Sequence, residues 1–238
     1  MSRDSESGPL VREQTLAERV YRRLRSALVG GRLPPGYRLV NRAMAQEFGV
    51  SLTPIREALM RLVNEGALEL DLRGVAWVPR LLPDRYAEIT ELRIELEGRA
   101  AARATLLATT QDIENLRGIQ TRLLEARQAS DFPSVLAENE RFHFTVLSIA
   151  QMPILQRLVE NLWVQAGPTV NLLFTLQRDI SPANHAHNEW IASMAARDAD
   201  GARAALERDL RMNSQLVLPL LARDARSPVP TATSVIDL

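Results

Sequence analysis

The chain of 238 residues contains no cysteine and no lysine, so all 29 of its basic residues are arginine. Without cysteine no disulfide can form, and this composition is typical of a protein that works in a reducing compartment, here the cytoplasm. No apolar run approaches the roughly 20 residues that a membrane-spanning helix needs. The stretch 1–9 is polar rather than a signal peptide. These absences predict a cytoplasmic protein with no membrane partner.

The formal net charge is zero, but the charges are unevenly distributed along the chain. Residues 11–80 hold twelve Arg against seven acidic residues, whereas the part after residue 80 holds sixteen Arg against twenty acidic residues. An Arg-rich amino-terminal module can neutralise phosphates, which the acidic remainder would repel. Arg scattered over solvated helix faces would give the same count, so charge alone supports DNA binding only weakly.

The segment 33–62, LPPGYRLVNRAMAQEFGVSLTPIREALMRL, predicts two short helices joined by a tight turn. Gly49 supplies the turn, because glycine adopts a left-handed backbone conformation without steric cost. Ser51 can cap the second helix through its hydroxyl, and Ile55, Leu59 and Leu62 form its buried stripe. Arg56 and Arg61 lie off that stripe. The pattern indicates a helix-turn-helix whose second helix enters a DNA major groove, the alternative being any small helical hairpin on a surface.

Two short alternating segments, 66–70 and 75–78, follow the second helix and predict a β-hairpin. The connecting turn is Asp71-Leu72-Arg73-Gly74. A hairpin directly after a recognition helix is the wing of a winged helix-turn-helix.

Residues 11–80 closely resemble the GntR superfamily of bacterial transcription regulators. The resemblance rests on a dense set of residues: Pro35-Gly36, Leu39, Met44-Ala45, Phe48-Gly49-Val50-Ser51, Thr53-Pro54-Ile55-Arg56-Glu57-Ala58-Leu59, Arg61-Leu62 and Glu65-Gly66. Leu52 departs from the family, which usually carries there an Arg that reaches DNA. We expect the DNA-binding residues to be Arg42, Ser51, Leu52, Thr53, Arg56, Arg61, Arg73 and Gly74.

From residue 83 onward the pattern changes to long amphipathic helices. We expect helices capped by Asp84 and Thr110, one at about 133–150, one from 153 that is bent or broken at Gly167-Pro168, one from Ser181-Pro182 to about 200, and a last one ending near 221. The prediction is a mainly α protein: a disordered start (1–10), a winged helix-turn-helix (11–80), an all-helical domain of about six helices (84–222) and a disordered tail (223–238).

The helical part resembles the FCD ligand-sensing domain of the FadR subfamily. The resemblance rests on Glu91-Leu92-Arg93…Leu96-Glu97, Asn139…Phe142-His143 and His187…Ile191…Met194…Arg197-Asp198…Ala202. Helical spacing places Asn139, His143, His187, Asp209 and Arg93 on or beside apolar stripes, whereas His185 faces solvent. Buried polar groups are unfavourable unless they are paired or coordinated. We therefore expect these five residues to share a partner.

The resemblance implies that a divalent metal is that partner, because metal-binding FCD domains hold an ion with a carboxylate and three His. Asn139 takes the position of the carboxylate, His143 and His187 match His ligands, and Asp209 stands where the last His is usual. Two imidazoles with oxygen ligands suit Zn²⁺, Ni²⁺ or Mn²⁺. The alternative is a site without metal, in which His and Asp bond to each other or to an effector.

Arg93 is the predicted effector-binding residue, because an inward guanidinium is a bidentate clamp for a carboxylate. An ion pair with Glu97, four residues on, is the alternative role. The sequence thus predicts a metabolite-responsive regulator, a repressor in our interpretation, that senses a small organic acid and binds a palindromic operator as a homodimer. A metal-dependent enzyme that uses the His/Asp cluster is the rival hypothesis, although no nucleophile motif or Gly-rich phosphate loop accompanies the cluster.

Overall fold

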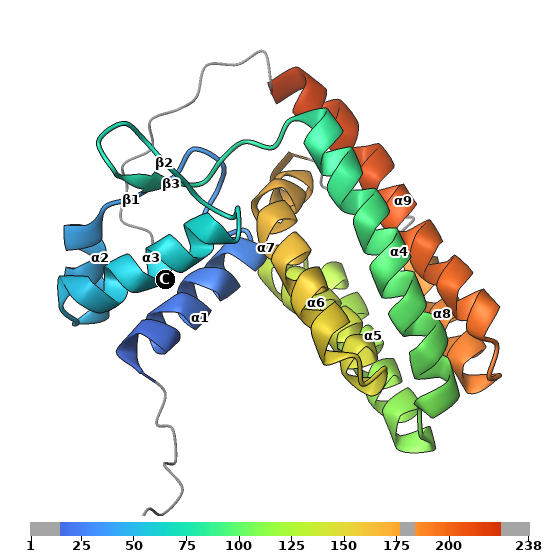
Figure 1. Cartoon of the computed structure of the whole chain (residues 1–238). Helices are drawn as coiled ribbons and strands as arrows, with labels where there is room; N and C mark the ends of the chain where they lie inside the picture. Colours follow the sequence, from blue (N-terminus) through green and yellow to red (C-terminus); the bar gives the residue numbers. More distant parts are fainter. Residues whose placement is uncertain (1–14, 177–183, 225–238) are drawn as a thin grey trace, which may run out of the picture.

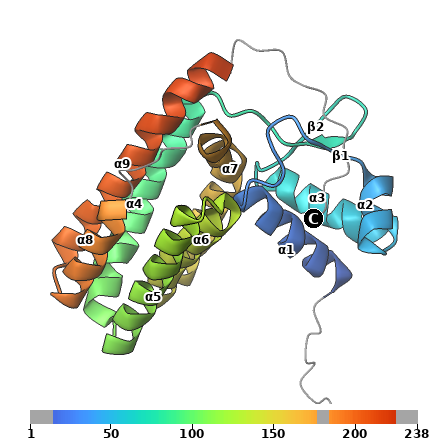
Figure 2. The same ribbon diagram turned by 180° about the vertical axis from the view of Figure 1, so that it is seen from behind.

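A computed structural model describes residues 15–176 and 184–224, with side-chain placements for 15–170 and 186–222. Figures 1 and 2 show a small module of helices and short strands beside an elongated bundle of long helices. In the described part the module comprises α1 (Leu16–Val29), β1 (Arg38–Leu39), α2 (Asn41–Phe48), α3 (Leu52–Asn64), β2 (Glu69–Leu70) and β3 (Ala76–Trp77). The bundle comprises α4 (Pro83–Leu107), α5 (Thr110–Gln128), α6 (Phe132–Ile149), α7 (Pro153–Leu176), α8 (Asn184–Ala195) and α9 (Ala199–Asp224).

Helix α1 is an element that our sequence analysis did not predict. Thr15 caps it, accepting a hydrogen bond from the Glu18 backbone N–H at 3.2 Å. Its buried stripe includes Val20, Leu24 and Leu28, and the helix packs against α3 on one side and α7 on the other. The sequence does carry a signal for the start of this helix: a Thr is followed three residues later by Glu, and apolar residues at helical spacing come next.

The turn between α2 and α3 follows the prediction at Gly49, which has φ 64° and ends α2 with its backbone N–H bonded to α2 carbonyls. Ser51 is the N-cap residue of α3, but its hydroxyl does not accept the predicted capping hydrogen bond from the first turn. Its side chain is exposed and open to an external partner. The buried face of α3 is the predicted one and includes Ile55, Leu59 and Leu62.

The wing is a three-stranded antiparallel sheet in the order β1-β3-β2, with strands shorter than predicted. Arg38 pairs with Trp77 in the first ladder, so β1 is a strand that the sequence analysis missed. The Asp71 carboxylate accepts the backbone N–H of Arg73 and of Val75, both at 2.9 Å, and Gly74 has φ 76°. This network fixes the turn at the tip of the wing.

Within the described residues, helices α4 to α9 agree with the predicted domain of about six helices, with three corrections at the ends of helices. Leu82 rather than Asp84 is the N-cap of α4, because Pro83 already occupies the first turn. Thr109 rather than Thr110 caps α5, since Thr109 and Asp112 form a reciprocal capping box. Helix α8 ends at Ala195 rather than near residue 200, because Arg197 has φ 62° and the Asp198 carboxylate accepts the Gly201 N–H at the start of α9.

Helix α7 continues through Gly167-Pro168, where we expected a break, and Pro168 lies inside it. Tertiary packing outweighs the missing N–H of proline, because residues 166–169 are all buried. Gly167 is required at its position: a Cβ there would lie 2.6 Å from the Leu28 carbonyl oxygen and from Val29 Cα. The backbones of α1 and α7 therefore touch, and Figures 1 and 2 show this junction between module and bundle.

One cluster of buried apolar side chains runs from the module into the bundle, including Leu28 and Val29 of α1 and Val159 and Val164 of α7. None of the helices in the described part of the chain is both long and apolar enough to span a bilayer. Helix α9 extends to Asp224, so the first two residues of the predicted disordered tail (223–238) are helical. The predicted disorder of 1–10 and of the rest of the tail, the helix start at Ser181-Pro182 and the solvated side chain of His185 lie outside the described residues and side chains.

Candidate functional site

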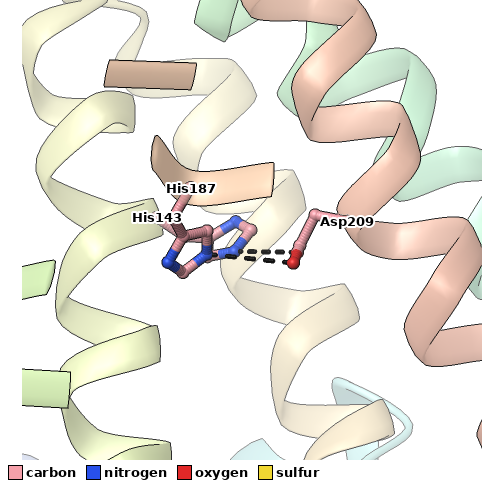
Figure 3. A group of neighbouring side chains, drawn as sticks. All are labelled: His143, His187 and Asp209. Carbon is pink, nitrogen blue, oxygen red and sulfur yellow. Dashed lines mark ion pairs between the residues drawn. The ribbon is translucent and has the colours of Figure 1, made fainter. Parts of the chain in front are cut away.

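Three titratable side chains meet in the interior of the helical domain, where His143 of α6 and His187 of α8 face Asp209 of α9 (Figure 3). They are 1%, 3% and 2% exposed. The His143 Nε2 lies 3.4 Å from Asp209 Oδ2, and the His187 Nε2 lies 3.9 Å from Asp209 Oδ1. The sequence analysis selected all three as inward residues, although 66 positions separate His143 from Asp209 in the chain.

The other nitrogen of each imidazole bonds to a buried side chain that the sequence analysis did not assign to the cluster. The His143 Nδ1 lies 2.8 Å from Glu97 Oε2, and the His187 Nδ1 lies 2.9 Å from Gln120 Oε1. Because an ionised carboxylate only accepts, the His143 Nδ1 carries a proton and donates it to Glu97. The amide oxygen of Gln120 likewise accepts from His187. Both Nε2 atoms are thereby aimed at Asp209.

Burial and neighbouring charges shift the pKa values of this cluster in opposite directions. Burial alone would raise the pKa of Glu97, but Arg93 and His143 outweigh it and lower that pKa to about 2. Asp209 follows the same pattern, its pKa lowered by His143, His187 and Arg93 against the effect of burial. Burial lowers the pKa of His187 to about 4, whereas the neighbouring Asp209 and Glu97 hold the pKa of His143 above its ordinary value despite burial. The site therefore holds two carboxylates and a neutral His187 at neutral pH.

The three inward atoms fit the donor set of a divalent metal. His143 Nε2, His187 Nε2 and Asp209 Oδ2 are buried and have no hydrogen-bond partner among the described residues. One ligand atom from each residue can be chosen so that all lie within 4.8 Å of one another. Imidazole nitrogens whose far side bonds to a carboxylate or an amide are typical of metal ligands, because that bond fixes the tautomer. The residues present therefore fit a divalent ion.

Arg93 is buried and already has a partner, the ion pair that the sequence analysis gave as its alternative role. Its Nε donates to Glu97 Oε1 at 2.6 Å, and its guanidinium lies 4.3 Å from the centroid of the Trp163 ring. The Trp163 Nε1 donates to the same carboxylate oxygen at 3.0 Å. Glu97 thus joins Arg93, Trp163 and His143. The effector role of Arg93 stays a prediction.

A cavity of about 70 Å³ opens beside this cluster, and His143, His187, Asp209 and Arg93 all line it. Asn139, the fourth predicted metal ligand, lines the same cavity and is half-buried. Val29 of α1 also lines the cavity, which the sequence analysis did not predict. Val29 belongs to the amino-terminal module, so the module forms part of the cavity wall.

The predicted DNA-binding residues lie on the module far from this cavity. Arg42, Ser51, Thr53 and Arg56 are exposed on α2 and the start of α3, Leu52 is half-buried, and Arg73 and Gly74 are exposed at the wing tip. No ion pair within the described residues engages the guanidinium of Arg42, Arg56 or Arg73. These cations are available to an external anion.

Arg61 differs from the other predicted DNA contacts because its side chain is engaged within the module. Its Nη1 lies 2.8 Å from Glu18 of α1, its Nε lies 3.2 Å from Glu65, and its guanidinium stacks 3.5 Å from the centroid of the Tyr21 ring. These contacts give Arg61 a structural role between α1 and α3.

A winged helix-turn-helix joined to a helical domain with an internal cavity lined by polar side chains is the arrangement of a DNA-binding regulator with its own sensory domain. Comparisons with known proteins agree. The family described as bacterial regulatory proteins, gntR family, matches residues 16–77, and the FCD domain family matches residues 88–212. The chain therefore belongs to the GntR family of bacterial transcription regulators, in the FadR-like subfamily that carries an FCD domain.

Relatives span nearly the whole chain. The HTH-type transcriptional regulator McbR of Escherichia coli (strain K12) is 32% identical over 192 residues, which cover 80% of this chain and 87% of McbR. The solved structure of E. coli McbR/YncC has a TM-score of 0.82 at 29% identity and covers 89% of this chain and 99% of its own. A GntR regulator from Rhodococcus sp. RHA1 shares the fold, with a TM-score of 0.72 at 20% identity over 85% of this chain and 97% of its own. These relatives are regulators, and the rival hypothesis of a metal-dependent enzyme is not supported.

Proposed function

We propose that this regulator senses a small organic acid in the helical domain and changes its affinity for a palindromic operator in response. The observation that carries the proposal is the cavity, which joins the His/Asp cluster to Val29 of the DNA-binding module. A gel-shift assay on DNA upstream of its own gene, with and without candidate acids, tests it. The expected result is specific binding that an acid alters. Specific binding that no acid alters would contradict the sensing function.

The operator contacts that we propose are the exposed residues around the start of α3 and at the wing tip: Arg42, Ser51, Leu52, Thr53, Arg56, Arg73 and Gly74. Arg56 can read a guanine edge in the major groove, and Arg73 can reach a phosphate or the minor groove. We expect an operator that departs from the commonest half-site of the family, because Leu52 offers apolar contact with a thymine methyl where an Arg is usual. Arg61 would contact DNA only by leaving Glu18 and Glu65.

A divalent metal (Zn²⁺, Ni²⁺ or Mn²⁺) held by His143, His187 and Asp209, with Asn139 at the edge, is the proposed resident cofactor. When bound, such an ion is a Lewis acid that accepts an oxygen of an effector carboxylate. Elemental analysis of purified protein supplied with metal tests the site. We expect about one equivalent per chain in the wild type and in His185→Ala, and loss in His143→Ala and His187→Ala. A wild type that retains no metal would favour the site that bonds the effector directly.

Coupling between cavity and DNA-binding module can pass through α7. The Gln165 amide donates to the Glu65 carbonyl oxygen, at the end of α3, at 3.0 Å, and its oxygen accepts from Arg85 at 3.2 Å. Trp163, two residues earlier, bonds to Glu97 in the effector site. A ligand that favours one position of α7 would thereby shift the recognition helix, which is the differential interaction that allostery requires. We expect Gln165→Ala to weaken the effect of the acid on operator affinity without changing acid binding.

The homodimer is proposed to form through the helical domain, because two-fold symmetry matches a palindromic site. Exposed apolar side chains extend along α7 and onto α4: Ile154 is 69%, Leu158 53% and Leu92 45% exposed. Leu158→Arg should shift the mass in light scattering from dimer to monomer, whereas Leu72→Arg at the wing tip should not. A wild-type monomer would contradict the proposal.

We also propose that the protein acts as a repressor in the cytoplasm. The support is the name of a relative, the HTH-type transcriptional repressor RspR of E. coli (strain K12), which is 24% identical over 211 residues, 86% of this chain and 90% of RspR. A reporter gene behind the bound promoter should be more active when this gene is deleted. Lower activity in the deletion strain would instead identify an activator.

A further inference from the structure

We infer that Leu72, at the tip of the wing, is an apolar wedge that enters the minor groove of the operator and unstacks one base step in each half-site. This role rests on the proposed contact between the wing and DNA, and it deepens that contact. It gives the wing a way to select sequence with a side chain that forms no hydrogen bond to any base.

Leu72 is the most exposed large apolar side chain of the described residues. Its relative exposure is 109%, whereas the next value is 69%, for Ile154. Single exposed leucines are common on protein surfaces and by themselves indicate no function. Leu72 differs from such leucines because the chain around it is fixed by hydrogen bonds and because a cation stands next to it.

The hydrogen bonds hold the backbone on both sides of Leu72. The Gly74 N–H donates to the Asp71 carbonyl oxygen at 2.9 Å and closes a β-turn, whose two central residues are Leu72 and Arg73. The Asp71 carboxylate accepts the N–H groups of Arg73 and Val75, and the Asp71 N–H donates to the Val75 carbonyl oxygen at 3.0 Å. Because this turn is already ordered, little backbone entropy is lost when its side chain enters a partner.

The charge at the wing tip favours DNA as that partner. The Asp71 carboxylate is neutralised by Arg38, whose Nη1 donates to it at 2.8 Å. The Arg73 guanidinium is exposed and takes part in no ion pair of the described residues. The tip therefore presents a leucine directly beside an available positive charge, and the minor groove attracts such a charge through its negative potential.

The position of the wing tip also fits a duplex held by the recognition helix. In both Figure 1 and Figure 2, the loop between β2 and β3 lies with α2 at the end of the module away from the bundle. Helix α2 leads through Gly49 directly into the start of α3. Because major and minor grooves alternate along a duplex, a wing beside a helix in the major groove meets the neighbouring minor groove.

Base faces are the most favourable contact for a leucine in that groove. The floor of the minor groove presents hydrogen-bonding groups that a leucine cannot satisfy. Between two base pairs, by contrast, its methyl groups lie against apolar base faces, and wedges of this kind kink the duplex by about 20–90°. Pyrimidine–purine steps such as TA and CA/TG unstack most easily. Leu72 should therefore select such a step.

The adenine analogue 2-aminopurine, whose fluorescence rises when it unstacks, tests this role directly. It would replace each adenine in turn, on both strands, in the operator that the gel shift identifies. Wild-type protein should brighten the probe at one step per half-site. Leu72→Ala should lose this signal, Leu72→Met should keep it, and Leu70→Ala, at an exposed leucine of β2, should leave it unchanged. Leu72→Ala should fold normally, because the side chain is fully exposed.

A second measurement tests the selection of sequence. Replacing the brightened step by AA, which is stiffer, should weaken wild-type binding about 10-fold, the usual effect of one unfavourable base pair. The same replacement should leave the affinity of Leu72→Ala nearly unchanged, because that variant unstacks no step. An equal loss in both proteins would show that another residue reads the step.

The wedge would be overturned if no probe brightened with wild-type protein, or if the signal persisted in Leu72→Ala. Arg73→Ala separates this failure from a failure of the proposed wing contact. Weaker operator binding by Arg73→Ala, with no brightened probe in the wild type, would leave the wing on the DNA and remove the wedge. Unchanged binding by Arg73→Ala, again with no brightened probe, would remove both.

Discussion

The module and the helical domain use arginine in opposite ways. On the module, Arg42, Arg56 and Arg73 are exposed and lie outside any ion pair of the described residues. In the helical domain, Arg93 is 8% exposed and is held between Glu97 and the Trp163 ring. The first arrangement leaves positive charge available to a polyanion, and the second uses it to stabilise buried carboxylates.

The difference shows that arginine can serve either to bind a partner or to stabilise the folded interior. An exposed guanidinium costs little to maintain and is neutralised only when a partner arrives, so its effect should depend on salt. A buried guanidinium must be paired in the folded state, because an isolated buried charge is very unfavourable. Mutations should therefore affect function in the module and stability in the cluster.

The largest effect is expected from Glu97→Ala. This change leaves Arg93 buried without its partner and removes the acceptor of Trp163 and His143, so we expect a loss of about 3–5 kcal/mol in the free energy of unfolding. Glu95→Ala, on the same helix, breaks an exposed pair with Arg203 at 3.0 Å and should cost less than about 1 kcal/mol. Urea denaturation of both variants measures the contrast. Equal losses would show that burial of the pair does not matter.

Gly167→Ala tests the junction that connects the two regions. The added Cβ would meet the α1 backbone at 2.6 Å, so we expect a loss of about 1–3 kcal/mol from overpacking. Gly118→Ala on α5 is the control, because its Cβ would meet only the Arg122 Nη1 at 3.6 Å. That change should stabilise the helix by up to about 1 kcal/mol. A neutral Gly167→Ala would mean that α1 and α7 are not held at this distance.

Tyr21→Phe should have a smaller effect than Glu97→Ala. The Tyr21 hydroxyl donates to both carboxylate oxygens of Glu65, at 3.0 and 2.9 Å, and Arg61 remains as a partner for Glu65 after the change. We expect a loss of about 1 kcal/mol in the free energy of unfolding, the net value of one hydrogen bond. A larger loss in thermal denaturation would indicate that Tyr21 also organises Arg61.

The same tyrosine predicts a pH dependence. Burial, then the hydrogen bond and charge of Glu65, raise the pKa of Tyr21 to about 12. Because the folded pKa lies above the ordinary value of 10.0, the contribution of the neutral phenol is fully present below pH 10 and is lost as the pH rises toward 12. Wild type should therefore lose more stability than Tyr21→Phe over that interval. If the free energy of unfolding fell equally with pH in the two proteins, the raised pKa of Tyr21 would be contradicted.

Local patterns in the sequence predicted the local structure well. The Gly49 turn, the buried face of α3, the wing turn and the six-helix count all depend on neighbours within one or two helical turns. End positions were less certain: Thr109 rather than Thr110 caps α5, because the reciprocal bond with Asp112 decides between adjacent candidates. Helix α1 was not predicted, although Thr15 and Glu18 form a local helix-start pattern.

The partners inside the site could not be predicted, because they are distant in sequence. Glu97 meets His143 across 46 positions, and Gln120 meets His187 across 67. The sequence identified inward polar residues on single helices but not how the helices combine them. Pro168 shows the same limit: burial of α7 against α1 keeps the helix continuous where the local rule predicts a break.

In this account operator binding is assigned to the module and acid sensing to the helical domain. Fluorescence anisotropy of labelled operator DNA, with and without the most tightly bound acid, tests this assignment most directly. We expect Arg56→Ala to weaken operator binding about 10-fold or more, the loss of one bidentate base contact, while acid binding stays as in the wild type. His187→Ala should retain operator affinity in the absence of acid and lose the response to it, because the change removes a ligand of the proposed metal. An Arg56→Ala protein that binds the operator as tightly as the wild type, or a His187→Ala protein that responds normally to the acid, would contradict the account.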